Sequence, residues 1–245
     1  MLFVEWLRVK RPLPVYWLAN YHYCPAKVKN ILEMGPSESE VLEVGKLVHE
    51  EELVPVAEEF VRAVGPIQYA SPLAMTVDQV LSGLAGVVRR ALRKRAVIAN
   101  TEEETLLWLM EPELGIIGIP DMVDCSNGRE PVVVELKSTG RIPRRPWSDH
   151  VVQVGAYTLC LRAMGFENAR VAHIRYVERG GRRAHTFTIL VDETVEHIVR
   201  ATVRSLRALL EGRARWCGTD NPRKCLVCDY RHVCPFSLAR GRNVN

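Results

Sequence analysis

One short segment, Val132-Val133-Val134-Glu135-Leu136-Lys137, constrains the fold more than any other part of the 245-residue chain. Three consecutive valines indicate a strand with both faces covered, as in the interior of an α/β sheet. Because side chains alternate between the two faces of a strand, Glu135 and Lys137 lie on the same face. Burying a charge costs free energy unless the charge is paired or binds a metal. We therefore expect a covered sheet with two charged residues inside it.

Helical and strand-like segments alternate along the rest of the chain. Residues 38–64 carry apolar residues three or four positions apart, which predicts a helix or helix pair bent near Pro55. Further helices are expected over 75–95, 148–164 and 193–211. The expected strands are 97–99, 106–110, 116–119, 132–136, 170–177 and 186–191. With no repeat and no long linker, this order predicts one α/β domain with a mixed sheet flanked by helices.

The composition excludes several classes of protein. With 47% hydrophobic and 25% charged residues, the chain can bury a core, and neither a disordered nor a collagen-like protein fits. No run approaches the roughly 18 apolar residues of a membrane span. The first ten residues contain Glu5 and no apolar run with a cleavage site, and the seven cysteines are an odd number. We therefore expect a cytoplasmic protein with reduced thiols and no membrane contact.

The net charge of +4 conceals an asymmetry between the two halves of the chain. Residues 1–130 hold 13 basic and 19 acidic residues, a net −6, whereas residues 131–245 hold 20 basic and 10 acidic residues, a net +10. Of the 33 cations, 26 are arginine, whose planar guanidinium suits phosphate. This asymmetry favours a nucleic-acid partner.

A carboxylate precedes the turn that leads into the charged strand. Asn127-Gly128 separates two short strand-like runs, so Asp121 is expected to meet Glu135 and Lys137 from the neighbouring strand. Two carboxylates provide hard oxygen ligands for Mg²⁺ or Mn²⁺, and Lys137 provides a cation beside a phosphate or an attacking water. The pattern fits a phosphodiester-cleaving site. An ordinary solvated strand face is the alternative.

Two helical motifs add polar groups to this picture. Gln153 and Tyr157 are four residues apart on one face of the helix that follows the strand, where they can bind a backbone phosphate or orient the catalytic groups. On the first long helix, His49 follows Gly45 by one turn, and a neutral imidazole can complete a metal site. A surface or core role stays open for His49, and a packing role for Tyr157.

The cysteines fall into two groups. Cys225, Cys228 and Cys234 form a C-x₂-C-x₅-C run followed by proline, and Cys24-Pro25 is a fourth candidate ligand about 200 residues upstream. Such a site would join the N-terminal to the C-terminal segment. The spacing favours an iron–sulfur cluster, while zinc, with His232 as a substitute ligand, stays open. We expect the other three, Cys125, Cys160 and Cys217, to be bystanders, the first two packed in the core.

A basic segment follows the charged strand directly. Arg141, Arg144 and Arg145 precede Trp147, so a phosphate backbone and one base could be contacted beside the candidate site. Runs of charge are also common on solvated faces, and the arginines at 89–95 and 182–183 are weaker candidates for the same role.

Taken together, these motifs resemble a known family. Gly45 with His49, Gly118 to Asp121, Glu135 with Lys137, and Gln153 with Tyr157 occur in the order and spacing of RecB-like nucleases of the PD-(D/E)xK superfamily. With the four cysteines added, the chain resembles the CRISPR-associated Cas-four exonucleases from about Tyr21 to Pro235.

The resemblance implies a restriction-endonuclease-like fold, a single RecB-like domain over 1–245, and an iron–sulfur clasp formed by residues 20–30 and 217–236. His49, Asp121, Glu135 and the Leu136 carbonyl would bind Mg²⁺ or Mn²⁺. Lys137 would position or activate the attacking water, and Gln153 and Tyr157 would hold the substrate. A 4Fe-4S cluster is favoured and a 2Fe-2S cluster stays open for Cys24, Cys225, Cys228 and Cys234.

The implied activity is metal-dependent exonuclease cleavage of single-stranded DNA ends during CRISPR adaptation, alongside the integrase subunits Cas one and Cas two. Two alternatives stay open. One is a catalytically idle DNA-binding adaptor with an iron–sulfur or zinc centre, and the other is a general DNA-repair nuclease.

Overall fold

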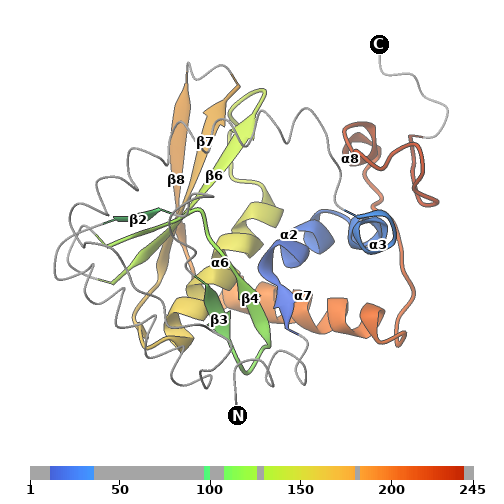
Figure 1. Ribbon diagram of the computed structural model, residues 1–245. Helices are drawn as coiled ribbons and strands as arrows, with labels where there is room; N and C mark the ends of the chain where they lie inside the picture. The colour runs from blue at the N-terminus through green and yellow to red at the C-terminus, as the bar shows by residue number, and fades with distance from the viewer. Residues whose placement is uncertain (1–11, 36–96, 100–107, 126–129, 180–182, 240–245) are drawn as a thin grey trace.

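A computed structural model describes residues 12–35, 97–99, 108–125, 130–179 and 183–239 (Figure 1). The two helices expected over 38–64 and 75–95 lie outside these residues, as do Gly45 and His49. Among the described helices, none is long and apolar enough to cross a membrane.

The larger of two sheets contains the charged strand at its centre. Its order is β2-β5-β6-β7-β8, with β6 parallel to β7 and the other neighbours antiparallel. Val132 to Leu136 are all buried, which confirms the covered strand. The strands are β2 (Val97–Ala99), β5 (Met122–Asp124), β6 (Val132–Thr139), β7 (Val171–Glu178) and β8 (Ala184–Leu190).

A second, small sheet corrects the expectation of a single one. Its order is β1-β4-β3, formed by β1 (Leu13–Pro14), β4 (Ile116–Gly118) and β3 (Leu109–Glu111). The chain leaves β4 at Gly118 and starts β5 at Met122, and Pro120 between them has no N–H group for a ladder. The two strand-like runs around Pro120 therefore enter different sheets.

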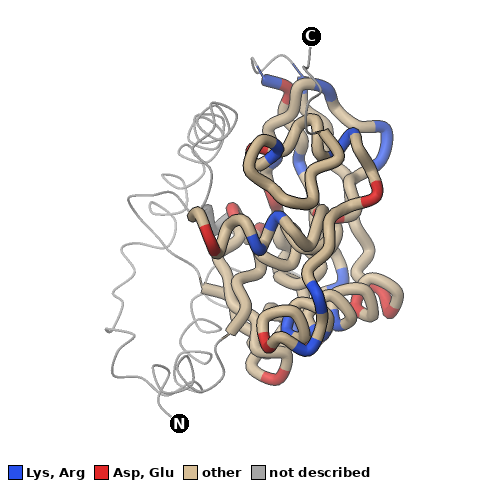
Figure 2. The backbone as a smooth tube through the Cα atoms, turned by 90° about the vertical axis from the view of Figure 1, so that its right-hand side faces the viewer, with Lys and Arg blue, Asp and Glu red and all other residues tan. Residues whose placement is uncertain are grey.

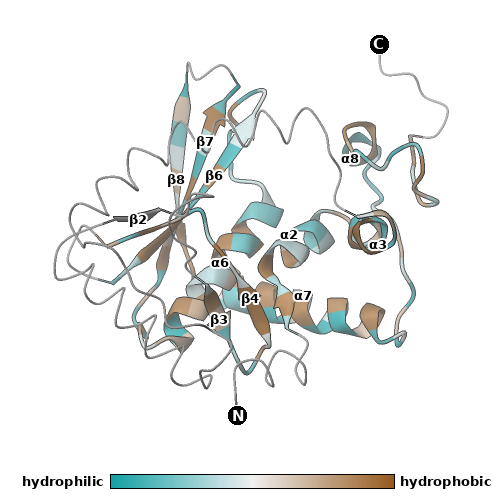
Figure 3. Cartoon of the chain, in the orientation of Figure 1, coloured by the Kyte–Doolittle hydropathy of each residue, from teal (hydrophilic) through white to brown (hydrophobic). Residues whose placement is uncertain are grey.

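Helix α6 (Ser148–Ala163) is the centre of the molecule. Its residues 152–161 are all buried, as expected of a helix that is covered on every side. It packs on β6 and β7 of the large sheet and, on its other side, on α2, α7 and the small sheet (Figures 1 and 3). Helix α7 (Glu193–Leu210) buries residues at helical spacing against it and begins at Asp192, whose side chain accepts the Val195 N–H at 3.0 Å.

Three helices at the two ends of the chain were not expected from the sequence. They are α2 (Val15–Tyr23), α3 (Pro25–Met34) and α8 (Pro222–Leu226). Each begins at or directly after a proline, a residue whose fixed φ suits the first turn of a helix. In Figure 1, α3 and α8 lie together on the side of α2 that faces away from the large sheet.

Replacing Gly155 with alanine tests the close packing of α6 on α7. A Cβ atom at this position would lie 2.7 Å from Cγ1 of Val195 and 3.2 Å from Cγ2 of Val199. Helix propensity alone would make Gly155→Ala more stable by about 1 kcal/mol. We expect overpacking to outweigh this gain and to lower the free energy of unfolding by about 1–3 kcal/mol in urea titrations. A double variant with Val195→Ala should recover most of the loss, whereas a more stable single variant would contradict the packing.

Candidate active site and thiol cavity

Asp121 lies directly before β5, beside the charged segment of β6. Met122 of β5 pairs with Val134 of β6, so the residue before Met122 reaches the level of Glu135. The Oδ2 atom of Asp121 accepts a hydrogen bond from the Leu136 backbone N–H at 2.7 Å. The carboxylate is therefore fixed next to Glu135 by the backbone of β6, on the neighbouring strand that the sequence predicted.

Glu135 and Lys137 form an ion pair inside the sheet. The Lys137 Nζ atom lies 2.8 Å from Glu135 Oε1, and the side chains are 21% and 4% exposed. Burial lowers the pKa of Lys137, but the charges of Glu135 and Asp121 outweigh it, so the pKa lies above its usual value. Lys137 is therefore a protonated ammonium group at neutral pH.

Burial has the opposite consequence for Asp121. It raises the pKa of the carboxyl, and the positive charge of Lys137 and the Leu136 N–H only partly oppose it. A buried carboxyl of this kind is stabilised in its charged form by a cation at ligand distance. The oxygen donors of Asp121 and Glu135 fit Mg²⁺ or Mn²⁺ in their chemistry.

Gln153 of α6 contacts Glu135 of β6. Its Nε2 donates to Glu135 Oε1 at 2.5 Å, and the residue is 7% exposed. Glu135 Oε1 thus accepts hydrogen bonds from both Gln153 and Lys137. The sequence left two functions open for Gln153, binding a backbone phosphate and orienting a catalytic group. This geometry favours the second, in which Gln153 orients Glu135.

Tyr157 lies one helical turn further along the same face of α6. Its hydroxyl donates to the Ile119 carbonyl at 2.7 Å, which holds the short segment leading to Asp121. A Cβ atom on Gly118 would lie 3.0 Å from Cε1 of Tyr157 and 3.1 Å from Cβ of Val15. A larger residue at 118 would therefore crowd the Tyr157 ring and Val15, a steric reason for glycine that the motif alone did not reveal.

The predicted metal ligands divide between described and undescribed residues. Asp121, Glu135 and the backbone of Leu136 lie together, while His49 is outside the described residues. In the described part of the chain, no three His, Cys, Asp or Glu side chains are arranged to hold a metal ion. The described residues thus contribute two carboxylates, and catalytic Mg²⁺ sites commonly complete such a pair with water and substrate phosphate.

The basic segment forms the connection from β6 to α6. Arg141, Arg144 and Arg145 are exposed, and Trp147, directly before α6, is 46% exposed. From the side of α7 and α8, Lys and Arg positions are spread among acidic ones over the described chain (Figure 2).

His150 was not recognised from the sequence. Its Nδ1 lies 2.8 Å from the Tyr176 hydroxyl, and its Nε2 lies 3.6 Å from Oδ2 of Asp149. Burial, followed by the positive charges of Lys137 and Lys27, lowers the pKa of His150 to about 2. The imidazole is therefore neutral, and Lys137 lies near enough for its positive charge to disfavour protonation of the ring.

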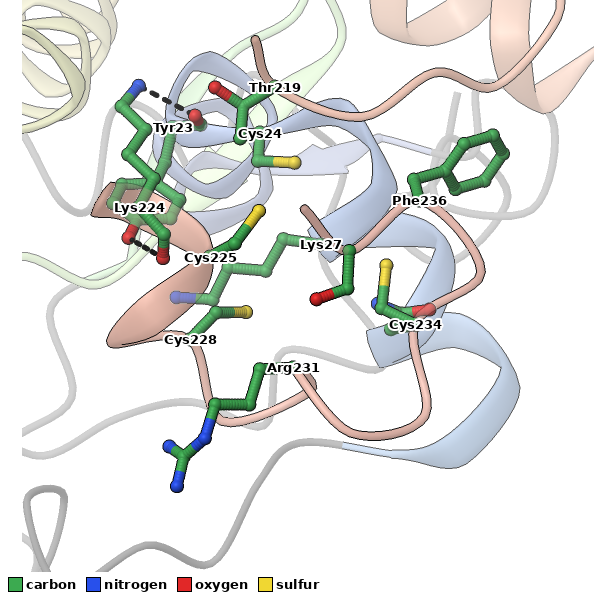
Figure 4. Close-up of a pocket in the computed structure, with 12 residues that line it drawn as sticks. Tyr23, Cys24, Lys27, Thr219, Lys224, Cys225, Cys228, Arg231, Cys234 and Phe236 are labelled. Atoms are coloured by element: carbon green, nitrogen blue, oxygen red, sulfur yellow. Dashed lines mark hydrogen bonds between the residues drawn. The ribbon is translucent and has the colours of Figure 1, made fainter. Parts of the chain in front are cut away.

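Four of the seven cysteines line one cavity of about 310 Å³, part of which is open to solvent. They are Cys24, Cys225, Cys228 and Cys234, and Figure 4 shows their sulfur atoms turned toward the shared space. Cys125 and Cys160 lie in the hydrophobic core, as expected of packing residues. Cys217 is exposed and does not line the cavity.

Contacts beside the cavity join the two ends of the chain. The Tyr23 hydroxyl donates to the Lys224 carbonyl at 2.8 Å, and Lys224 Nζ donates to the Tyr23 carbonyl at 2.7 Å. The ammonium groups of Lys27 and Lys224 also lie 5.1 and 4.8 Å from the centre of the Tyr23 ring. Tyr23 directly precedes Cys24, and Lys224 directly precedes Cys225. The two hydrogen bonds between Tyr23 and Lys224 therefore hold these cysteines close together.

Burial also affects the chemistry of the cavity thiols. It raises the pKa of Cys24 and of Cys228 above the usual value of a thiol, so both are protonated at neutral pH in the described structure.

The buried His150 predicts a loss of stability in acid. Its pKa is 6.5 without the protein environment and about 2 in the folded protein, so between these values only the unfolded chain binds the proton. The free energy of unfolding should fall as the pH drops below 6.5, by at most about 1.4 kcal/mol per pH unit from this group. Urea titrations at several pH values should show a weaker fall for His150→Gln, and an unchanged fall for the exposed control His197→Gln. Equal pH dependence in all three proteins would contradict the prediction.

Comparisons with known proteins identify the family of the chain. No curated protein matches the chain significantly. A solved structure described as "Crystal structure of SSO0001" is similar over 87% of this chain and 96% of that chain, with 17% sequence identity and a TM-score of 0.37. A family model shows the family of the chain. The model of the PD-(D/E)XK nuclease superfamily matches residues 18–235, a range that includes Asp121, Glu135, Lys137 and the four cavity cysteines. The match indicates metal-dependent hydrolysis of phosphodiester bonds, with DNA as the substrate. The chain belongs to the PD-(D/E)XK nuclease superfamily.

Proposed function

We propose that the protein is a metal-dependent DNA exonuclease that acts mainly on single-stranded ends, with one RecB-like domain over 1–245. One observation carries this proposal. Asp121, Glu135, Lys137 and Gln153 come from three different elements and meet in one hydrogen-bonded group at β6. A solvated strand face would need none of these contacts, because water would satisfy its charges.

Each side chain has a defined role in the proposed reaction. Asp121, Glu135, His49 and the Leu136 carbonyl would hold the metal ion. That ion, Mg²⁺ or Mn²⁺, lowers the pKa of a bound water and polarises the phosphate when it is present. Lys137, kept protonated by the two carboxylates, positions the attacking water and stabilises negative charge on the phosphate.

The α6 residues support these groups without reaching the substrate themselves. Gln153 fixes the orientation of Glu135, and Tyr157 fixes the segment before Asp121. Both are at least nine-tenths buried, which favours positioning over direct contact with DNA. The exposed Arg141, Arg144, Arg145 and Trp147 follow β6 directly and are the proposed contacts for the DNA strand.

We further propose an iron–sulfur cluster, most simply 4Fe-4S, held by Cys24, Cys225, Cys228 and Cys234. Four sulfur atoms around one cavity support a thiolate-bound cluster of this class. Lys27, Lys224 and Arg231 also line the cavity, and their positive charges would stabilise an anionic cluster. The cluster would fasten residues 20–30 to residues 217–236.

The proposed setting is CRISPR adaptation in the cytoplasm, where the nuclease would trim DNA for the integrase subunits Cas one and Cas two. The combination of the nuclease motifs with the four-cysteine cavity supports it. Stable association with a tagged Cas one–Cas two complex, tested by size-exclusion chromatography, checks it. Elution as separate species in the presence of prespacer DNA would favour a general DNA-repair nuclease.

Conservative substitutions test the nuclease proposal. Asp121→Asn, Glu135→Gln and Lys137→Met each remove one charge, and each should slow cleavage of end-labelled single-stranded DNA in Mn²⁺ by at least about 100-fold. Glu167→Gln removes an exposed carboxylate after α6 and should cleave like the wild type. Chelation of the metal should stop cleavage by all proteins. DNA binding without turnover in the wild type would favour an idle adaptor instead.

Cysteine substitutions test the cluster. Protein purified without oxygen should contain iron and acid-labile sulfide and absorb broadly near about 400 nm. Cys228→Ser should lose this absorbance and unfold at a lower temperature, because the cluster joins the two ends of the chain. Cys217→Ser, which alters an exposed thiol outside the cavity, should keep both properties. Colourless wild-type protein with one bound zinc ion would overturn the cluster proposal.

A further inference from the structure

A row of aromatic side chains lies beside the candidate active site. Trp147 packs edge-on against Tyr176, with ring centres 5.6 Å apart and planes at 76°. Tyr176 in turn meets Phe187 at 5.7 Å, and Phe187 meets His185 at 4.5 Å. These rings come from the segment before α6, from β7 and from β8. Tyr176 belongs to the hydrophobic core and Phe187 packs against that core, whereas Trp147 is exposed, so core packing does not account for the indole ring.

Strand register places this row level with the catalytic lysine. Lys137 of β6 pairs with Tyr176 of β7, which pairs with His185 of β8. Glu135 pairs with Ile174, which pairs with Phe187. Paired residues project from the same face of a sheet, and neighbouring strands are about 4.8 Å apart. The aromatic residues therefore extend from Lys137 to the free edge of the sheet over about two strand spacings.

The first ring of the row is exposed but held in place. Trp147 is 46% exposed, whereas Tyr176 beneath it is fully buried. The Trp147 backbone N–H donates to the Tyr176 hydroxyl at 3.1 Å, and its carbonyl accepts the Val151 N–H at 3.1 Å. His150 contacts the same hydroxyl at 2.8 Å and packs against the indole ring at 5.2 Å. A large aromatic surface is thus presented to solvent with little freedom left to lose on binding.

The charges around Trp147 identify the class of ligand. Arg141, Arg144 and Arg145 are exposed in the preceding residues. The Arg179 backbone N–H donates to the Thr139 carbonyl at 2.8 Å, and its guanidinium lies beside Gly140. Aromatic surface combined with several arginines is typical of sites for single-stranded nucleic acid, in which a base stacks and the phosphates are neutralised. An apolar protein partner would gain nothing from these cations.

We propose that Trp147, supported by Tyr176 and His150, forms a stacking subsite for one unpaired base next to the scissile phosphate, with Phe187 and His185 continuing the track toward the edge of β8. The subsite rests on the proposed nuclease function and deepens it. An internal base of a duplex has both faces covered by its neighbours, so stacking on Trp147 away from a blunt end requires an unpaired nucleotide. The subsite would therefore contribute to the proposed preference for single-stranded ends.

Binding measured without metal separates this subsite from catalysis. Oligonucleotides with 2-aminopurine at successive positions should lose fluorescence at one position when bound to the wild type in EDTA, because the base stacks. Trp147→Ala should abolish that loss and weaken binding of single-stranded DNA about tenfold. Trp147→Phe should keep most of both effects, and Trp108→Ala, at a half-exposed tryptophan before β3, should keep all of them. Duplex DNA of the same length should bind Trp147→Ala and the wild type within about twofold.

A second variant excludes an effect of misfolding. Tyr176→Phe keeps the buried ring and removes the hydroxyl that holds Trp147, so it should reduce the fluorescence change without the complete loss seen in Trp147→Ala. Equal single-strand affinity and equal fluorescence in the wild type and Trp147→Ala would overturn the subsite even if the protein cleaves DNA. Stacking at Trp147 in a protein that cleaves nothing would support the subsite and overturn the nuclease proposal alone.

Discussion

The buried charge of Glu135 is the constraint on which the rest of the structure depends. A carboxylate that is only 4% exposed would destabilise the fold if it had no partners, and Lys137 and Gln153 both bind its Oε1 atom. Gln153 can reach Glu135 only if α6 packs directly on β6. That packing in turn requires a helix that can be buried on every side, and a small residue at 155, where α7 packs against it. The site and the core are therefore one arrangement, and a change that shifts α6 alters both.

The same helix also distributes polar groups along the sheet. Tyr157 reaches the segment before Asp121, Gln153 reaches Glu135, and His150 at the first turn reaches Tyr176. Successive turns thus hold the segment that leads into β5, the carboxylate of Glu135 in β6 and the tyrosine beneath Trp147. A helix rises about 5.4 Å per turn and neighbouring strands are about 4.8 Å apart. Side chains from successive turns of one helix that crosses a sheet can therefore contact successive strands.

Sequence patterns predicted those parts of the structure that depend on residues close together in the chain. Three valines predicted β6, the four-residue spacing placed Gln153 and Tyr157 on one face, and the Asn-Gly pair at 127–128 predicted that Asp121 would lie beside Glu135. The small sheet was missed because β1 has two residues and its partner lies about 100 positions away. The sequence also did not predict the close packing around Gly118 or the contact of His150 with Tyr176. Each depends on residues that only folding brings together. A proline at the start of α2, α3 and α8 was the one local sign of those helices.

Helix α2 links the two proposed centres mechanically. It begins at Val15, whose Cβ is packed against Gly118 near the Tyr157 ring, and it ends at Tyr23, directly before Cys24. Nine helical residues span about 13 Å, so the support of Asp121 and the thiol cavity lie at opposite ends of one short rigid element. The Tyr23–Lys224 pair holds the cavity end without any metal, and a cluster would add four covalent bonds to the same junction. Loss of the cluster should therefore loosen α2 first, and Val15 would transmit that movement to the segment that positions Asp121.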